Sequence, residues 1–438
     1  MPWNLAMAIP MIVGRERGNV MSDQADEVVA GGGLLHRRSL LGFAAAIGAA
    51  GTARAADPVG QGSPPAMLKQ GRGFEAYGVP SDFEKPVLKT IAFGAGRPGT
   101  GTSRTPLHML EGTITPAGLH FERHHNGVPD LDPAKHELLI HGLVERPLIF
   151  TRETLSRYPM ESRVHFIECA GNSGANAGPG GLTGDVTSIH GLLSNSEWTG
   201  VSLKLLLDEA GVKKEARWVL AEGADPAGMS RSVPMSICMD DAMIALYQNG
   251  EAIRPANGYP MRLLLPGCQG NANVKWLRRL KAVATPVNTK DETSKYSLLL
   301  PDGRAEQFHL EFGPKSVILK PSPGLTMKSA GLYEISGLAW TGGGKIRKVE
   351  VSADGGKSWA QAALTGPVQS KAATRFRMPW RWDGGPAVVL SRATDEKGEV
   401  QPTRNSWLAM YGPGQGYHYN AIQSWAIAAN GAVTNVYL

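Results

Sequence analysis

The feature that most constrains this 438-residue chain is an apolar run that ends on a single cysteine. Residues 164–167 are predicted to form a strand, Cys169 follows it, and Gly171-Asn172-Ser173-Gly174 is typical of a loop that leaves a strand. We expect the thiol at this position to be accessible to a ligand instead of buried, because the glycine-rich backbone around it allows a close approach. This segment alone leaves two other interpretations open, a buried core cysteine and the nucleophile of a hydrolase.

The N-terminal region has the features of a twin-arginine export signal. Arg37 and Arg38 precede the apolar stretch 42–50, and Ala53-Arg54-Ala55 supplies a small-residue cleavage pattern. We therefore predict that residues 1–55 are a signal peptide and that the folded protein is exported to the periplasm; the alternative is an ordinary arginine pair. No later stretch reaches the roughly 18 apolar residues of a membrane span, so none is expected.

Cysteine content and charge exclude several classes of protein. The three cysteines, Cys169, Cys238 and Cys268, are an odd number for an oxidising compartment, so a disulfide framework does not carry the fold. We expect Cys238 and Cys268 to matter for stability more than for turnover. The net charge of +6 is spread over the chain without a Lys/Arg run, which argues against nucleic-acid binding. No Cys-x-x-Cys-His motif occurs, so no c-type haem is expected in this chain.

The remaining length, about 380 residues, predicts two domains. Residues 56–105 are rich in Gly, Pro, Ser and Thr and are predicted to form an extended arm. Gly94–Gly99 matches GxGxxG, but Pro98 cannot open the helix that a dinucleotide site needs. Residues 106–311 are predicted to form an α+β domain. Its expected elements are strands at 137–141, 164–167, 218–221 and 261–265 and a helix at 201–210 capped by Gly211.

Residues 312–410 show period-two strands separated by turns, and Asp354-Gly355 is typical of a hairpin. The expected strands are 333–340, 346–352, 358–363, 374–378 and 387–394. This pattern predicts an immunoglobulin-like β-sandwich without the cysteine pair of antibody domains, which we assign to contact between subunits. The aromatic, Gly-rich residues 411–438 are predicted to form a tail that is exchanged with a neighbouring subunit or docks a partner.

Three further segments place charged side chains near one another. Residues 119–129 put Arg123, His124 and His125 in a polar loop, residues 258–277 carry Arg262 inside an apolar strand and Lys275 after a Gly-rich turn, and residues 221–228 contain Asp225. An arginine within an apolar strand must find an anion or a carboxylate. Ordinary ion pairs would also satisfy each basic residue separately.

These segments resemble the molybdopterin-binding core of the sulfite oxidase family, and within it most closely the molybdenum subunits of the sulfane dehydrogenases of thiosulfate oxidation. The resemblance implies a cofactor of molybdenum and molybdopterin in which one cysteine thiolate binds the metal. Cys169 is then the metal ligand, a soft donor suited to such a site, and Cys169, Arg123 and Tyr296 are the expected catalytic residues. The expected cofactor-binding residues are Phe121, Arg123, His124, His125, Asp225, Asn257, Arg262, Asn273, Val274 and Lys275.

The chain departs from this family pattern at two places. Asn257 stands where the family has a histidine, so one cofactor hydrogen bond must be made differently. Ser173 and Gly174 stand where sulfite oxidases carry arginine. Loss of that cation removes a contact to a small dianion worth about 1.5–3 kcal/mol, which disfavours free sulfite and favours sulfur carried on a larger partner.

The resemblance therefore implies a periplasmic oxidoreductase that oxidises sulfane sulfur on the cysteine of a carrier protein with oxygen from water. Its electrons would pass to a separate cytochrome c, and the C-terminal domain would form a homodimer. Two alternatives remain at this stage, a sulfite dehydrogenase with the same cofactor and a cofactor-free binding scaffold. A scaffold has no need for a free thiol beside cations, which argues against the second.

Overall fold

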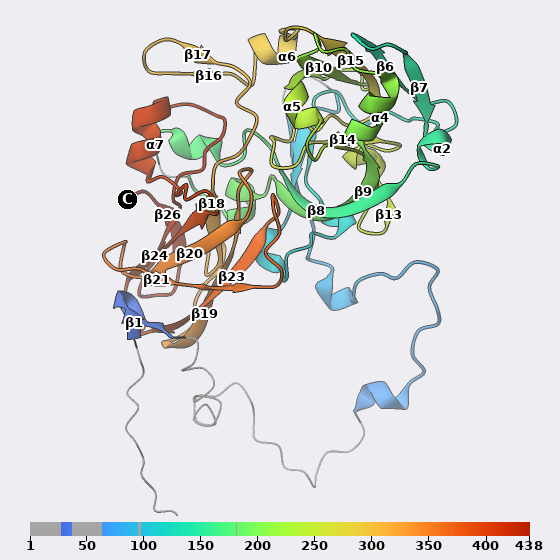
Figure 1. Ribbon diagram of the computed structural model, residues 1–438. Coiled ribbons are helices and arrows are strands. Elements are labelled where there is room, and N and C mark those ends of the chain that lie inside the picture. Colours follow the sequence, from blue (N-terminus) through green and yellow to red (C-terminus); the bar gives the residue numbers. More distant parts are fainter. Residues whose placement is uncertain (1–27, 37–63, 95–97, 181) are drawn as a thin grey trace, which may run out of the picture.

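The computed structural model describes residues 28–36, 64–94, 98–180 and 182–438 (Figure 1). Two bodies are visible, one built around strands β6–β15 and one around β18–β26. The arginine pair, the apolar stretch and the cleavage pattern of the predicted leader lie outside the described residues. Within the described ranges, none of the helices has the length and apolar character needed to cross a lipid bilayer.

The first body contains two five-stranded sheets. One has the order β11-β10-β15-β6-β7, with β6 and β15 parallel, and the other has the order β13-β12-β9-β8, with β14 paired to β12. The first comprises Glu137–Gly142 (β6), Leu148–Thr151 (β7), Trp218–Gly223 (β10), Ser230–Pro234 (β11) and Leu277–Val283 (β15). The second comprises Met160–Glu168 (β8), Leu193–Ser202 (β9), Met243–Gln248 (β12), Glu251–Ala252 (β13) and Arg262–Leu264 (β14).

Helix α4, Leu203–Ala210, packs in the core that the two sheets share. Its buried residues Leu203, Leu206, Leu207 and Ala210 follow the spacing of one helix face, and Gly211 ends it in the left-handed conformation. The predicted helix start at Val201 was wrong, because Val201 and Ser202 complete β9 and pair with β12. The other helices of this body are short: Arg152–Leu155 (α2), Met235–Cys238 (α5) and Lys290–Thr293 (α6). Val186–His190 (α3) packs against the second body, since Val186 and Ile189 belong to its core cluster.

The second body is a sandwich of two antiparallel sheets with a common core. One sheet has the order β1-β2-β23-β19-β18, with β22 also paired to β23, and the other has the order β21-β20-β24-β25-β26. The strands of the first are Val28–Ala30 (β1), Leu34–Leu35 (β2), Lys315–Lys320 (β18), Gly331–Trp340 (β19), Ala363–Thr365 (β22) and Thr374–Trp382 (β23). The strands of the second are Ile346–Ser352 (β20), Ala360–Gln361 (β21), Ala387–Asp395 (β24), Ser424–Ile427 (β25) and Val433–Val436 (β26).

The C-terminal residues belong to this sandwich instead of forming a separate tail. After helix α7, Arg404–Tyr411, strand β25 pairs with β24 of the same chain and β26 pairs with β25. Residues 424–436 thus pair within the chain, and their exchange with a neighbouring subunit stays a prediction. The hairpin predicted at Asp354-Gly355 is present, since this turn joins β20 to β21. The strand expected at 358–363 is instead divided between β21 and β22, which belong to different sheets.

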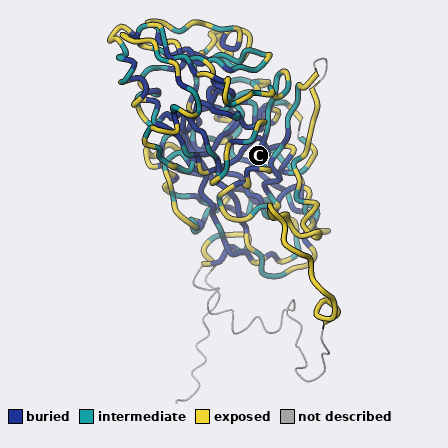
Figure 2. Tube along the Cα trace, turned by 90° about the vertical axis from the view of Figure 1, so that its right-hand side faces the viewer, coloured by how far each residue is buried: buried dark blue, intermediate teal, exposed yellow. Residues whose placement is uncertain are grey.

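The predicted arm lies largely outside both bodies. Residues 64–89 run along the exterior with short turns at Pro65–Leu68 and Asp82–Glu84, and Figure 2 shows this stretch as almost wholly exposed. The arm then forms Thr90–Phe93 (β3) and Gly101–Arg104 (β4). Strand β4 pairs with Glu122–His124 (β5), so the end of the arm supports a strand that carries two predicted site residues.

Candidate active site

Cys169 lies immediately after the nine-residue strand β8, at the start of the loop that leaves it. Its amide donates to the carbonyl oxygen of Leu192 at 3.0 Å, and its carbonyl accepts from the amide of Asn172 at 2.8 Å. Burial raises the pKa of the thiol, while a hydrogen bond from the Gly171 backbone and the positive charge of Arg123 act in the opposite direction. The backbone therefore fixes one free cysteine at the wall of a pocket beside a cation.

Arg123 and His124 lie on strand β5, not in the loop that the sequence predicted. The strand forms because its partner β4 comes from the N-terminal arm, a pairing that the local pattern does not reveal. His124 Nδ1 faces Lys275 Nζ at 2.9 Å, and His124 Nε2 faces a Glu122 carboxylate oxygen at 3.0 Å. Because the ammonium can only donate, its contact requires a neutral imidazole that accepts at Nδ1. Burial also lowers the pKa of His124.

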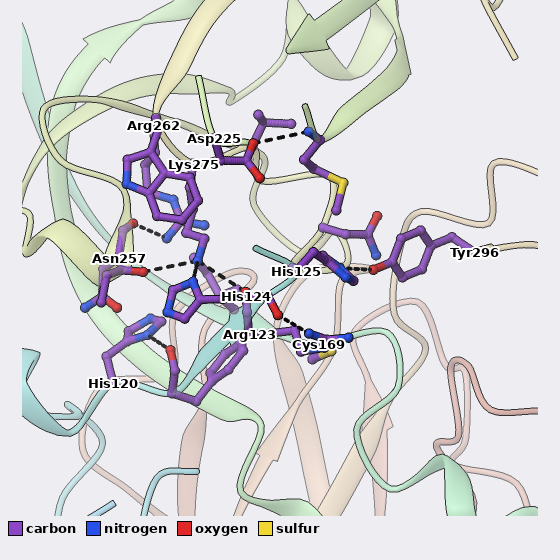
Figure 3. A pocket seen from close by; sticks show the side chains of 18 residues that line it. His120, Arg123, His124, His125, Cys169, Asp225, Asn257, Arg262, Lys275 and Tyr296 are labelled. Atoms are coloured by element: carbon purple, nitrogen blue, oxygen red, sulfur yellow. Dashed lines mark hydrogen bonds between the residues drawn. The ribbon is translucent and has the colours of Figure 1, made fainter. Parts of the chain in front are cut away.

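A single pocket gathers most of the predicted site residues (Figure 3). It encloses about 700 Å³ of empty space out to its mouth. Of the predicted residues, its lining contains Phe121, Arg123, His124, His125, Cys169, Asp225, Asn257, Arg262, Val274, Lys275 and Tyr296. The side chains come from β5 and the residues that flank it, from β14 and the turn before it, from the loops after β8, β10 and β14, and from the segment after α6. These segments are far apart in the sequence.

Two basic side chains in this pocket, the buried Arg262 and the half-buried Lys275, have no acidic partner. The Arg262 guanidinium donates to the carbonyl oxygens of Asn257 and Asn273, both at 2.8 Å, and its Nε has no hydrogen-bond partner in the described structure. Lys275 Nζ contacts carbonyl oxygens and His124, and among the described residues neither basic group forms an ion pair with a carboxylate. Burial lowers the pKa of Arg262 to about 9 and that of Lys275 to about 7.

A buried guanidinium without a counter-ion, beside a half-buried lysine that also lacks one, indicates an anionic ligand, since an unpaired buried charge is costly. A Cβ at Gly258, whose φ is +116°, would lie 3.1 Å from Arg262 Cβ and 3.2 Å from Lys275 Cβ. Glycine at this position thus lets both basic side chains converge on the same wall. The arrangement is suited to a phosphate or a similarly charged group, with Arg262 Nε left to donate to it.

Tyr296 and His125 form a polar pair on another wall of the pocket. The Tyr296 hydroxyl lies 3.1 Å from His125 Nε2. Burial lowers the pKa of His125 to about 3 and raises that of Tyr296, so both groups are neutral at pH 7. The Tyr417 ring, from the C-terminal segment, lies 5.3 Å from the Tyr296 ring between centroids. The second body therefore also contributes to the surroundings of the site.

One predicted cofactor residue, Asn273, does not line the pocket. Its side chain accepts a hydrogen bond from the Leu265 amide and donates to the carbonyl oxygens of Cys268 and Gln269. It therefore shapes the turn between Arg262 and Lys275, and only its carbonyl supports Arg262. Asn257 does line the pocket, and its side-chain amide donates to Gln248 Oε1 at 3.1 Å.

The sequence reasoning missed seven residues that line the same pocket. They are His120, Ile167, Met229, Ala256, Gly270, Asn271 and Trp276. Six of them are within two positions of a predicted residue or the glycine-rich turn. Their closeness in the sequence to predicted residues could therefore have indicated them. Met229 had none, because it reaches the pocket through the loop between β10 and β11.

A buried ion pair lies directly behind the cysteine. Lys315 Nζ of β18 donates to a carboxylate oxygen of Glu168 at 2.7 Å, and both side chains are nearly inaccessible, with 2% and 0% of their surface exposed. Glu168 also accepts from Trp340 Nε1 at 2.6 Å and Asn172 Nδ2 at 2.9 Å. Lys315 and Trp340 belong to the sandwich, so the second body neutralises a charge next to the site cysteine.

Ser173 and Gly174 face away from the pocket, which corrects the substrate argument drawn from them. Ser173 Oγ accepts from Lys315 Nζ at 3.0 Å and lies 2.6 Å from His190 Nδ1. Gly174 packs against the backbone of the C-terminal segment, and a Cβ there would overlap the carbonyl oxygen of Gly416. An arginine at either position would meet the sandwich instead of extending into the pocket.

We therefore expect Gly174→Arg to destabilise the protein by about 1–3 kcal/mol, as overpacking does, and to leave the binding of sulfite unimproved. Gly180→Arg is the matched control, because Gly180 lies in the same glycine-rich stretch and a Cβ there meets nothing within 4 Å. Denaturant unfolding and the KM for sulfite measure both effects. A Gly174→Arg protein with unchanged stability and a lowered KM would contradict this packing.

Comparisons with known proteins are consistent with this geometry. Residues 125–290 match the family described as "Oxidoreductase molybdopterin binding domain", and residues 306–424 match the "Mo-co oxidoreductase dimerisation domain". The crystal structure of the sulfane dehydrogenase SoxCD from Paracoccus pantotrophus superimposes with a TM-score of 0.84. It shares 44% sequence identity and covers 88% of this chain and 100% of that chain.

Curated relatives are more distant. NADH nitrate reductase from Ulva prolifera is 30% identical over 352 residues, which cover 70% of this chain and 40% of that protein. Mitochondrial sulfite oxidase from Mus musculus is 28% identical over 327 residues, which cover 68% of this chain and 59% of that protein. The matched region thus spans about two fifths of the nitrate reductase and about three fifths of the sulfite oxidase.

Proposed function

Because this chain belongs to the sulfite oxidase family of molybdopterin oxidoreductases, we propose that it oxidises sulfane sulfur attached to the cysteine of a carrier protein. Its reaction class is that of a molybdenum-dependent oxidoreductase. The observation that carries the substrate proposal is the 44% identity to a sulfane dehydrogenase across all of that chain. Oxidation of free sulfite is the second candidate, favoured by the likeness to sulfite oxidases.

The residues around the pocket fit the molybdenum–molybdopterin cofactor. Cys169 would hold the metal through a thiolate, the kind of soft ligand that such a site takes. Arg262 and Lys275 would hold the anionic end of the pterin, because both line the pocket without an acidic partner and the buried Arg262 Nε has no acceptor in the described structure. When bound, the cofactor supplies two-electron oxidation of the substrate's sulfur with an oxygen atom that comes from water.

The remaining polar side chains would act on the substrate. Arg123 lines the pocket beside Cys169 and would bind the negatively charged sulfur group. Tyr296 remains protonated, since burial raises its pKa, so its hydroxyl can donate a hydrogen bond into the pocket. Neutral His125, at 3.1 Å, fixes the position of that hydroxyl. We assign catalytic roles to Cys169, Arg123 and Tyr296 on this basis.

The substrate proposal is tested by competition between two sulfur donors. The protein, loaded with cofactor and supplied with a cytochrome c, is assayed once with sulfite and once with a carrier protein bearing cysteine-bound sulfane. The expected kcat/KM for the carrier exceeds that for sulfite by about tenfold or more, in line with the 44% identity to a sulfane dehydrogenase. A clear preference for sulfite would favour the sulfite dehydrogenase instead.

We also propose roles for the two domains, an electron acceptor and a cellular location. Residues 106–311 would form the catalytic unit, and the sandwich would form a homodimer, in line with the match to a dimerisation domain. Electrons would leave to a separate cytochrome c, because the sequence contains no Cys-x-x-Cys-His motif. The leader at 1–55, with Arg37 and Arg38, supports export to the periplasm by the twin-arginine route.

A further inference from the structure

Part of the predicted leader is bound to the folded sandwich. Val28–Ala30 and Leu34–Leu35 form a small hairpin, and Leu34 pairs with Trp380 of strand β23. Figure 1 shows this hairpin, labelled β1, at the end of the sandwich beside β19 and β23. The segment lies two residues before the paired arginines in the sequence. It is not part of the catalytic pocket and has no role in the function proposed above.

The three glycines of this segment touch the sandwich through their backbone. The carbonyl oxygen of Gly32 accepts from Trp380 Nε1 at 2.6 Å, and the amide of Gly31 donates to Ser358 Oγ at 2.7 Å. A Cβ at Gly32 would lie 2.6 Å from the carbonyl oxygen of Ala353, and a Cβ at Gly33 would overlap the carbonyl oxygen of Arg381. Both glycines have positive φ, +71° and +86°. Side chains at Gly32 and Gly33 are therefore excluded by sterics and by backbone conformation.

The two leucines that follow are buried, and Leu34 enters the interior of the sandwich. Leu34 and Leu35 are 0% and 2% exposed, and Leu34 belongs to the main core cluster of the sandwich. Removing these leucine side chains from water stabilises the contact. By contrast, Val28 of the same hairpin is 56% exposed. The contact is thus made by the glycine turn and the two leucines.

This hairpin also covers a sheet edge. Strand β22 pairs with the first part of β23, at Arg375–Arg377, whereas β2 pairs with β23 at Trp380. Without β2, the second part of β23 would lack its neighbour on that side. An unpaired edge strand is a template for another strand, and here the occupant is a strand of the same chain.

We propose that Val28–Leu35 is a docking strand by which the leader binds the folded C-terminal sandwich in the same molecule. This inference rests on the proposed leader but not on the catalytic proposal. The dock is composed of Trp380 and Arg381 of β23 and of Ala353 and Ser358 in the β20–β21 turn, so it exists only after these segments have folded together. Binding therefore couples the position of the leader to completion of the C-terminal domain, and removal of residues 1–55 would uncover the edge of β23.

Hydrogen exchange of the full chain tests the docking strand. The amides of Gly31–Leu35 are expected to exchange at least about tenfold more slowly than in Leu34→Asp, because a charge at that buried position releases the strand. In Leu34→Asp, the amides of residues 379–382 should also exchange faster, while β8 and β9 of the catalytic body remain unchanged. Val28→Asp is the matched control, since this exposed position on the same hairpin should leave the exchange as in the original protein.

Two outcomes would overturn the inference. One is equal, rapid exchange of residues 31–35 in the original protein and in Leu34→Asp. The other is protection that disappears on dilution together with a dimer in light scattering, which would place the strand on a second copy of the chain. Since exchange is measured without turnover, a failure of the molybdenum function leaves the result interpretable, and loss of the docking strand leaves the catalytic proposal untouched.

Discussion

Cys169→Ser is expected to abolish turnover and to yield protein with little or no molybdenum. A hydroxyl is a poor replacement for the thiolate in a site that needs a soft ligand. The expected loss of activity exceeds about 100-fold, which is the upper end for residues that merely support a metal ligand. Metal analysis and the electron paramagnetic resonance signal of the partly reduced metal measure the loss independently of activity.

The matched control is Cys238→Ala. Cys238 is also a free thiol, but it is fully buried in the core of the catalytic body, and burial raises the pKa of its thiol to about 12. Its replacement should cost stability of about 1 kcal/mol, a common value for one substitution, and leave the molybdenum content unchanged. If Cys169→Ser retains metal and turnover, the assignment of Cys169 as the metal ligand is wrong.

Lys315→Met is expected to have the largest effect on folding, a loss of about 3–5 kcal/mol in the free energy of unfolding. This substitution leaves the carboxylate of Glu168 buried without its cation, and breaking a buried pair from one side has that cost. Glu168 precedes Cys169 in the chain, so the metal content should fall as well. Denaturant unfolding gives the first quantity and metal analysis the second.

The double variant Lys315→Met, Glu168→Gln separates the effect of the unpaired charge on stability from the effect of the lost packing. A neutral glutamine can still accept from Trp340 Nε1, which lies 2.6 Å from the Glu168 carboxylate, and no unpaired charge remains. Most of the lost stability should therefore return in the double variant. If Lys315→Met alone unfolds at the denaturant concentration of the original protein, the pair contributes nothing to the contact between the two bodies.

Several properties of this protein follow from the sequence alone. An apolar run that ends at Cys169 and is followed by turn residues predicts a thiol at the end of a strand, and the structure has β8 ending at Glu168. The period-two pattern after residue 312 predicts the sandwich, because alternation of apolar residues is sufficient to define a half-buried strand. The motifs around Cys169 and Arg262 also indicated the family, which the comparisons confirm.

The tertiary structure decided how distant segments meet. Arg123 lies on a strand because residues of the N-terminal arm pair with it, and Gly174 faces the backbone of Gly416 from the far end of the chain. Asn273 faces the turn that it stabilises, although its neighbour Val274 lines the pocket. Local sequence patterns report the period and polarity of one segment. These contacts depend instead on which other segment packs against it, and in the case of Gly416 that segment is more than a hundred residues away in the sequence.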